Sequence, residues 1–291
     1  MTKIPPYQYS EWEGYKANFP FIIEIHIIPV FFKSHRHNCI EFHYVIEGSG
    51  YELINDVTYP LEPGSFILIL PYQVHEFHCN NKEGLRIYNI SLKLDLLFGT
   101  DKLNNDINAM LFNNVEELPP YVKFPVEAHE KLLDIFSEIK YEFNNDFIWH
   151  DLLFISKLIE ILVLFDRKRR SEVTNVMAKS SQIKSKSIWD VVYYIHNHYA
   201  EEITLRNLSS HFHLNASYLS TLFKKTLGKS FLDFLNEIRI LHSCRLLSTT
   251  GLPITQIAYE AGFKSYSSFS RVFQEHKNMS AAAYRKLNFS K

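Results

Sequence analysis

The chain has 291 residues, of which 46% are hydrophobic and 15% aromatic, so it can form the packed cores of two domains and is not intrinsically disordered. Its three cysteines have no paired spacing, which excludes a disulfide framework, and the lack of a signal-type or membrane-length apolar run predicts a cytoplasmic protein that contacts no membrane. The first 181 residues hold 17 Lys and Arg against 25 Asp and Glu, and the remainder holds 14 against 7, so only the remainder suits a polyanionic partner.

Residues 19–95 have the composition of short β-strands. Segments such as FIIEIHIIPVFF, CIEFHYVIEG and SFILIL are rich in β-branched and aromatic residues, and turn signals at 48–50, 55–56 and 63–64 separate them. Short strands at this spacing predict an antiparallel β-barrel or sandwich, and we expect a barrel as the fold of a first domain, residues 1–125.

The stretch HRHNCIEFH, residues 35–43, concentrates polar side chains on one face of a strand. His35, His37, Glu41 and His43 stand at every second or fourth position, and alternate residues of a strand point to the same side. Three imidazoles and a carboxylate are also a ligand set that suits Fe, Mn, Ni or Zn. The residues therefore predict either the metal centre of an enzyme or a polar binding pocket.

The same stretch resembles the cupin family. The pattern HxHxxxExxxxxxG from residue 35 to 48 is similar to the first cupin motif, and Gly64 with His75 resembles the second. The second motif is incomplete, because Leu70 and Tyr72 stand where cupins usually carry Pro and Gly. The resemblance implies a cupin-like barrel. In metal-binding cupins the matching positions would be the ligands His35, His37, Glu41 and His75.

From residue 126 the apolar residues change to helical spacing. Two amphipathic helices are expected, joined near residues 144–146, and they form a helical hairpin over residues 126–168. The apolar stripes consist of Leu132, Leu133, Ile135, Phe136, Ile139 and Phe143 in the first helix and Ile148, Leu152, Ile155, Ile159, Leu162 and Val163 in the second. Such stripes either pack on the barrel or meet a second subunit, and we expect the hairpin to support a homodimer. Residues 169–187 are polar and rich in Ser and Lys, which predicts an interdomain linker.

The last part of the chain, residues 188–291, is helical and internally repeated. Four positions recur fifty residues later: Leu219, Phe223, Gly228 and Ser230 correspond to Phe269, Phe273, Asn278 and Ser280. Upstream of each set, ITLRNLSSHFHL and ITQIAYEAGF have the make-up of a short helix followed by a tight turn. We therefore predict an all-α domain with two helix-turn-helix units, which makes the whole chain α+β.

The second helix of each unit has a polar face opposite its apolar stripe. Short polar side chains with a cation on such a face can enter a major groove and reach base edges. The outward side chains are Ser217, Ser220, Thr221 and Lys224 in the first unit and Ser267, Ser270, Arg271 and Gln274 in the second. For one helix a solvated face is the simpler interpretation. The duplication, the basic charge and the linker together favour DNA binding through two helices ~34 Å apart.

These features resemble the DNA-binding domain of the AraC/XylS family of bacterial transcription regulators. The second unit carries the family signature at the expected spacings, in Arg239, Leu246, Leu247, Ile254, Ile257, Ala258, Gly262, Phe263, Phe269, Phe273, Ser280, Tyr284 and Arg285. Three positions depart from the pattern, since Ser243, Asn278 and Ala281 stand where the family usually has Ala, Gly and Pro. Asn tolerates the left-handed conformation that favours Gly at a helix end, so that change is mild.

The resemblance implies a DNA-binding transcription regulator and no enzyme. Its implied partners are double-stranded promoter DNA, a small-molecule effector in the barrel, a second copy of the chain and, by family analogy, RNA polymerase. The implied effector is a small polar metabolite such as a sugar, and activation is commoner than repression in the family. The alternative function is a metal-dependent cupin enzyme with an accessory helical module.

Effector contacts are expected along the polar face that begins at His35, and no cofactor is expected to be required. The candidates are His35, His37, Glu41, His43, Glu47, His75, Tyr88 and Asn89. Tyr88 and Asn89 are neighbours on one strand, so only one of them can face inward. Glu47 and a residue of that strand are included by resemblance to sugar-responsive members of the family. A divalent metal held by His35, His37, Glu41 and His75 is the alternative occupant, and polar groups with a structural role are the third interpretation.

Overall fold

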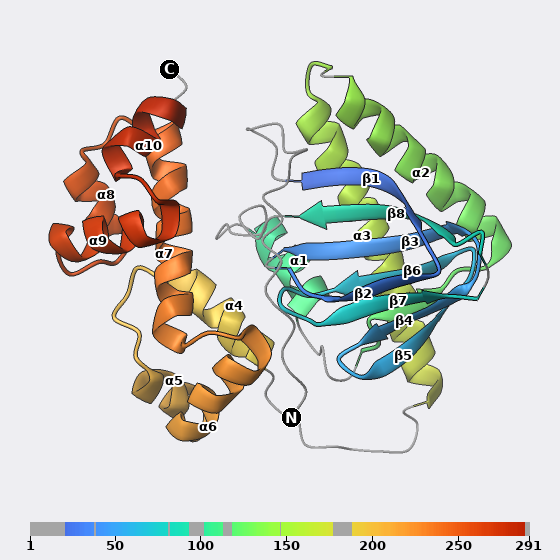
Figure 1. Cartoon of the computed structure of the whole chain (residues 1–291), viewed down its shortest axis with the longest axis horizontal. Helices are drawn as coiled ribbons and strands as arrows, with labels where there is room; N and C mark the ends of the chain where they lie inside the picture. The colour runs from blue at the N-terminus through green and yellow to red at the C-terminus, as the bar shows by residue number, and fades with distance from the viewer. Residues whose placement is uncertain are drawn as a thin grey trace. The chain divides into compact units, whose positions relative to one another are not determined.

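The computed structural model describes residues 21–37, 39–80, 82–92, 102–112, 118–145, 147–176 and 188–288, and the chain divides into two compact units, residues 1–187 and 188–291 (Figure 1). Residues 1–20 of the expected first domain and residues 177–187 of the expected linker lie outside the described residues. None of the helices within those ranges is both long and apolar enough to cross a membrane.

The first unit combines β-strands with three helices of the described chain. Its strands are β1 (Phe21–Ile28), β2 (Phe31–His35), β3 (Ile40–Glu47), β4 (Gly50–Ile54), β5 (Val57–Leu61), β6 (Ser65–Ile69), β7 (His75–Cys79), β8 (Leu85–Leu92) and β9 (Tyr121–Lys123). Its helices are α1 (Lys102–Phe112), α2 (Val126–Asn144) and α3 (His150–Val176). The strands fall where β-branched and aromatic residues were concentrated in the sequence, which confirms that part of the prediction.

The described strands pair antiparallel in two sheets, one of order β1-β8-β3-β6-β9 and one of order β2-β7-β4-β5. The predicted antiparallel fold is confirmed, but its hydrogen bonds make two sheets and no closed barrel within the described residues. Sheet edges therefore remain, and Pro60 lies in the edge strand β5, where a residue without an N–H is tolerated.

The space between the two sheets has an apolar part and a polar part. The apolar part is a cluster of buried side chains from both sheets, Ile28, Val45, Ile54, Leu61, Ile67, Ile69, Phe77, Leu85 and Ile87. Farther along the same strands the inward positions change to polar residues, among them Glu41 and His43 on β3 and His75 on β7. Because alternate residues of each strand point inward, the space between the sheets contains one hydrophobic and one hydrophilic region.

The other face of the five-stranded sheet packs against the hairpin of α2 and α3, which Figure 1 shows together on one side of the strands. Phe136 of α2 stacks on Tyr44 of β3 and on Tyr88 of β8, with ring centroids 4.8 and 5.1 Å apart. In α3 the buried stripe consists of Phe154, Leu158, Ile161, Leu162 and Phe165. The apolar stripes therefore pack on the sheet, which was one of the two interpretations left open by the sequence.

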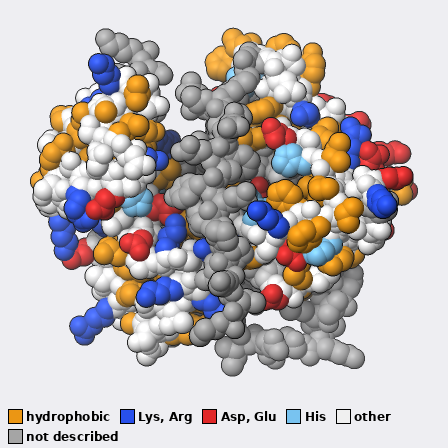
Figure 2. Space-filling model, in the orientation of Figure 1, with side chains coloured by type: hydrophobic (Ala, Val, Ile, Leu, Met, Phe, Trp, Pro, Cys, Tyr) orange, Lys and Arg blue, Asp and Glu red, His pale blue; other side chains and the backbone are white. Residues whose placement is uncertain are grey.

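The stripe predicted for the second helix of the hairpin is partly wrong. Ile148 and Leu152 are 82% and 61% exposed, and together with Phe147 and Trp149 they form an exposed apolar patch at the tip of the hairpin. Hydrophobic side chains gather there in the space-filling view (Figure 2). This segment is so rich in Leu and Ile that apolar residues recur at helical spacing on two of its faces. The face that packs on the sheet is the one that carries Phe154 and Phe165.

Helix α3 also extends into the predicted linker, because it ends at Val176 and not near residue 168. Arg169, in the supposed linker, is 2% exposed and donates two hydrogen bonds to Asp166 and one to the carbonyl of Met110 in α1. This buried guanidinium has hydrogen-bond partners and links α3 to α1. Arg169 therefore belongs to the packed domain and not to a linker.

The second unit is helical and contains two helix-turn-helix units, as predicted. Its elements are α4 (Ile188–His198), α5 (Leu205–Phe212), α6 (Ala216–Leu222), the π-helical stretch η2 (Phe223–Leu227), α7 (Phe231–Thr249), α8 (Ile254–Glu260), α9 (Tyr266–Lys277) and α10 (Ala281–Asn288). Helices α5 and α6 form the first unit and α8 and α9 the second, and the long helix α7 joins them.

The internal repeat is visible in the helix caps. The side chain of Asn215 caps the start of α6, and Ser265, fifty residues later, caps the start of α9. Ser230 caps α7 through a capping box with Asp233. The hydroxyl of Ser280, again fifty residues later, accepts a hydrogen bond from the backbone of α10. Equivalent caps fix equivalent helix starts, so both units present their second helix in the same way.

Candidate functional site

The side chains that were expected to contact DNA lie on α6 with the π-helical stretch η2 that continues it, and on α9. Leu219 and Phe223 in the first of these segments, and Phe269 and Phe273 in the second, are completely buried. The eight candidates lie away from these anchors: Ser217, Thr221, Lys224, Ser267, Arg271 and Gln274 are exposed, and Ser220 and Ser270 are half-buried. The two helices therefore present two polar faces, each anchored by a rigid aromatic core.

Local contacts order these polar faces. The Arg271 guanidinium donates to Glu275 one helical turn later, at 2.7 Å, and the hydroxyl of Thr221 donates to the carbonyl of Ser217 at 3.0 Å. Lys225, which was not among the predicted contacts, is exposed beside Lys224 in the π-helical stretch after α6. Its position next to a predicted contact residue was the available signal, and its ammonium suits a phosphate oxygen.

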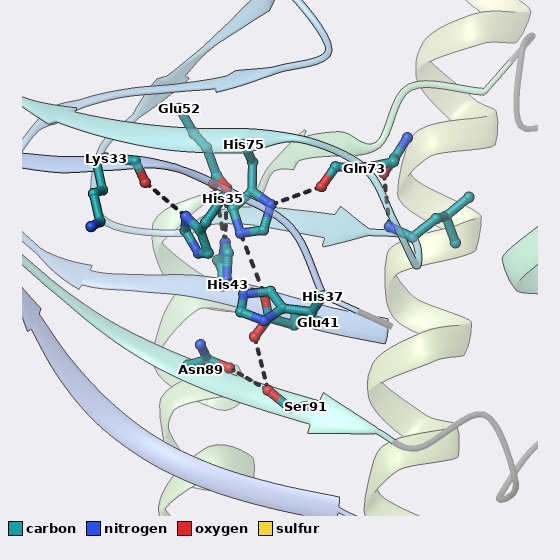
Figure 3. Close-up of polar contacts among 11 residues, drawn as sticks. Lys33, His35, His37, Glu41, His43, Glu52, Gln73, His75, Asn89 and Ser91 are labelled. Carbon is teal, nitrogen blue, oxygen red and sulfur yellow. Dashed lines mark hydrogen bonds and ion pairs between the residues drawn. The ribbon is translucent and has the colours of Figure 1, made fainter. Parts of the chain in front are cut away.

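A second candidate site lies in the polar part of the interior between the sheets (Figure 3). We call it the histidine cluster and define it by six residues, His35, His37, Glu41, His43, Glu52 and His75. They come from both sheets, since β3 supplies Glu41 and His43, whereas β2, β4 and β7 supply His35, Glu52 and His75. His37 lies between β2 and β3. Apart from His37, which is partly exposed, all of them are buried.

Glu41 is the centre of the histidine cluster. Its Oε2 lies 3.4 Å from Nε2 of His37, 3.4 Å from Nε2 of His75 and 3.7 Å from Nε2 of His43. Its Oε1 accepts a hydrogen bond from the hydroxyl of Ser91 at 3.0 Å. Burial disfavours the carboxylate, but the neighbouring imidazoles of His43, His75 and His37 hold the pKa of Glu41 well below its usual value.

His43 lies between two carboxylates. Its Nδ1 is 3.1 Å from both carboxylate oxygens of Glu52, which is completely buried. Burial alone would lower the pKa of this imidazole, but Glu52 and Glu41 raise the pKa of His43 to about 10. His43 is therefore an imidazolium at neutral pH.

Of the remaining imidazoles, those of His35 and His37 have a lowered pKa, and those of His35 and His75 are oriented by backbone carbonyls. Burial and the neighbouring His75 and His37 lower the pKa of His35 to about 3, and burial also lowers the pKa of His37. The Nδ1 atoms of His35 and His75 lie 2.9 and 3.2 Å from the carbonyl oxygens of Lys33 and Gln73. A carbonyl only accepts, so each ring carries a proton on Nδ1.

The structure brings together six of the eight expected effector residues and separates two. His35, His37, Glu41, His43, His75 and Asn89 all border the polar interior, with Asn89 joined to Glu41 through Ser91. Tyr88 points the other way and stacks on Phe136 of the hairpin. Glu47 lies beyond an irregularity in the β3–β8 register and pairs with Arg86 on the surface.

Two residues of this site, Glu52 and Ser91, were not among the predicted effector contacts. Glu52 lies in β4 with Ile54 on its inward side, and Ser91 follows Asn89 at the next inward position of β8. Strand alternation was the signal in both cases, because each residue shares its face with a neighbour two positions away. Alternation gives the face of Glu52, and the pairing of β4 with β7 then brings it beside the strand of His75.

The donor atoms of the histidine cluster fit a metal ion. Ligand atoms lie within 4.8 Å of one another in the set His35, His37 and His75 and also in the set Glu41, His43 and His75. Imidazole nitrogens with one carboxylate oxygen suit first-row transition metals, and hydrogen bonds from Nδ1 to backbone carbonyls are the usual way to orient metal-binding histidines.

Comparison with known proteins agrees with this two-part arrangement. Residues 22–139 match the family model described as "AraC-like ligand binding domain", and residues 208–287 match the model described as "Helix-turn-helix domain". The first model covers the two sheets and most of α2, and the second covers nearly all of both helix-turn-helix units.

Similar proteins span most or half of the chain. The melibiose operon regulatory protein of Escherichia coli is 25% identical and aligns over 99% of this chain and 93% of its own length. An uncharacterized HTH-type transcriptional regulator of Bacillus subtilis, YfiF, is 26% identical over 87% of this chain and 78% of its own. The lactose operon transcription activator of Staphylococcus xylosus is 29% identical over 50% of this chain and 49% of its own.

Proposed function

Because the chain belongs to the AraC family of DNA-binding transcription regulators, we propose that it is an activator whose DNA binding responds to a small polar effector. The duplicated helix-turn-helix unit, with two anchored polar helix faces, is the observation that carries the proposal. The alternative of a metal-dependent cupin enzyme is set aside, since the family and the similar proteins are regulators.

Recognition of DNA is assigned to α6 and α9. Lys224 supplies charge for phosphates, and Arg271 can donate two parallel hydrogen bonds to a guanine edge. The polar side chains around them, Ser217, Ser220, Thr221, Ser267, Ser270 and Gln274, are short enough to let each helix approach the groove. Two helices that read successive major grooves require a site whose two halves lie about one helical turn apart.

Effector binding is assigned to the polar interior of the first unit, with a sugar as the first candidate. The support is that two similar proteins are named for the melibiose and lactose operons. In the chain itself, the inward carboxylates, imidazoles and the amide of Asn89 can bind hydroxyl groups. An effector changes DNA binding only if it binds two arrangements of the protein with different affinities.

Self-association is assigned to the exposed patch at the hairpin tip, Phe147, Ile148, Trp149 and Leu152. Large apolar side chains that cluster on a surface usually serve an interaction. Contact with RNA polymerase, and activation in place of repression, rest on family analogy alone.

Selection of bound duplexes from a random pool by the full chain tests the proposal. We expect enrichment of a site with two elements about 10 base pairs apart. Sugars are then titrated while the melting temperature and the DNA affinity are followed, because an effector raises the melting temperature by mass action. Absence of any sequence enrichment at physiological salt would refute DNA recognition. If no sugar changed either quantity, the proposed effector class would be wrong.

A further inference from the structure

The histidine cluster holds donor atoms that the protein itself leaves unsatisfied. Among the described residues, Oε2 of Glu41 and Nε2 of His75 are buried and make no hydrogen bond, although they lie 3.4 Å apart. Nδ1 of His75 carries a proton, since it donates to the carbonyl of Gln73, so in the neutral ring Nε2 presents a lone pair to the carboxylate. Two buried acceptors that face each other are costly unless a cation lies between them.

The neighbouring imidazoles converge on the same point. His35 is anchored as His75 is, through Nδ1 and a backbone carbonyl, and the two rings lie 4.1 Å apart between centroids. Nε2 of His37 reaches the same oxygen of Glu41 at 3.4 Å. In metal-binding histidines one ring nitrogen usually donates to a carbonyl or carboxylate, and the other nitrogen faces the metal.

We propose that the histidine cluster binds one divalent transition-metal ion through the imidazoles of His35, His37 and His75 and the carboxylate of Glu41. The inference deepens the proposed function by naming an occupant of the effector site, and its regulatory meaning rests on that function. The close spacing of the donors favours an ion over direct sugar contacts at this point. The ligand atoms of His35, His37 and His75 lie within 4.8 Å of one another, and Oε2 of Glu41 lies 3.4 Å from Nε2 of both His37 and His75.

His43 and Glu52 are positioning residues in this site. Glu52 contacts Nδ1 of His43 through both oxygens at 3.1 Å, and His43 in turn approaches Oε2 of Glu41 at 3.7 Å. Ser91 holds the other oxygen of Glu41. The carboxylate is therefore fixed from two sides, with one oxygen directed at His37 and His75. An ion with three or four protein ligands keeps a position for an oxygen of a polar effector, so metal and effector can share the pocket.

The experiment uses the full chain after treatment with a chelator. Co²⁺ is titrated while visible absorption is recorded, and Zn²⁺ is measured by competition and by calorimetry. We expect one ion per chain and a rise in melting temperature on binding. The variants His37→Ala and Glu41→Gln should each weaken binding at least ~100-fold, more than the loss of an outer hydrogen-bond partner usually does.

The matched control is His78→Ala. His78 lies on the same strand as His75, but its ring stacks on Tyr51 and contacts Glu76 outside the histidine cluster. Circular dichroism establishes that each variant is folded, and Glu41→Gln retains the size of the side chain. The control should bind Co²⁺ as tightly as the unchanged chain.

Two results would overturn the metal site. One is the absence of saturable binding of Co²⁺, Zn²⁺, Mn²⁺ and Ni²⁺ by the folded, unchanged chain. The other is full-strength binding by the folded His37→Ala and Glu41→Gln variants, which would put the ion elsewhere. Duplex selection with the same preparations separates this inference from the proposed function. Sequence-specific DNA binding without metal binding would refute only the metal site. Metal binding without any DNA sequence preference would refute only the proposed function as a DNA-binding regulator.

Discussion

Gly228 and Asn278 lie fifty residues apart and end the second helices of the two helix-turn-helix units in the same left-handed conformation, with φ of 71° and 54°. Asn278 therefore takes the backbone role that glycine has in the first unit, as its tolerance for this region of φ and ψ allows. The departure from the family pattern at this position keeps the geometry of the turn.

Asn278→Ala should lower the free energy of unfolding by ~1 kcal/mol, because a Cβ without a compensating polar group is strained at positive φ. Asn278→Gly should be neutral or slightly stabilising. Urea unfolding of the full chain, followed by circular dichroism, measures both changes. The control is Asn236→Ala inside α7, where alanine favours the helix. Equal stability of the alanine and glycine variants at 278 would contradict this role.

Arg271→Ala should weaken specific DNA binding by ~1–3 kcal/mol and relax the preference at one base pair, if its guanidinium reads a base edge. Arg271 is exposed and already ordered by its ion pair with Glu275. Glu275→Gln is the control for the loss of that pair alone. The measurement is duplex selection with each variant, and an unchanged base preference for Arg271→Ala would rule out direct reading by this residue.

Lys224→Ala should lower DNA affinity by a similar factor for all duplexes and reduce the salt slope by about 1, since a lysine at a phosphate acts by counterion release. Lys224 is exposed in the π-helical stretch that follows α6. Fluorescence anisotropy at several salt concentrations, with specific and random duplexes, gives both quantities. A loss confined to one sequence would indicate a base contact instead.

The His43–Glu52 pair should make stability fall as the pH rises. The pKa of His43 is raised to about 10 in the folded chain, above the ordinary value of 6.5, so its protonation favours the folded state. That contribution is complete below about pH 6.5 and is lost as the pH rises through about 10. Melting temperatures of chelator-treated protein between pH 7 and ~10 measure it. His43→Gln should remove most of the slope, and an identical slope in both proteins would disprove the assignment.

Ile148→Glu should shift the protein from dimer to monomer in light scattering if the hairpin tip is the interface. Ile148 and Trp149 are 82% and 69% exposed, so a charge there costs little stability in the monomer but prevents apolar burial between two copies. The control is Val57→Glu, at another exposed apolar position on β5. A dimer that persists in the Ile148 variant but dissociates in the control would place the interface elsewhere.

Much of this protein is determined by local sequence. The caps, the apolar spacing and the fifty-residue repeat predicted both helix-turn-helix units, because helix starts, turns and buried faces depend on residues a few positions apart. Strand alternation likewise gathered His35, Glu41 and His43 on one face before any strand was paired.

Tertiary structure decided the rest, since strand register and the choice of a buried face depend on residues distant in sequence. Packing of the two sheets face to face brought Glu52 of β4 to His43 of β3, and the irregular register after Val45 left Glu47 on the surface. Packing of the hairpin on the five-stranded sheet buried Tyr88 against Phe136, away from the polar interior, and buried the phenylalanine side of α3. No local pattern predicts how the sheets pack or which face of α3 is buried. The folded chain adopts the arrangement that buries the most apolar surface, and that surface comes from residues far apart in the sequence.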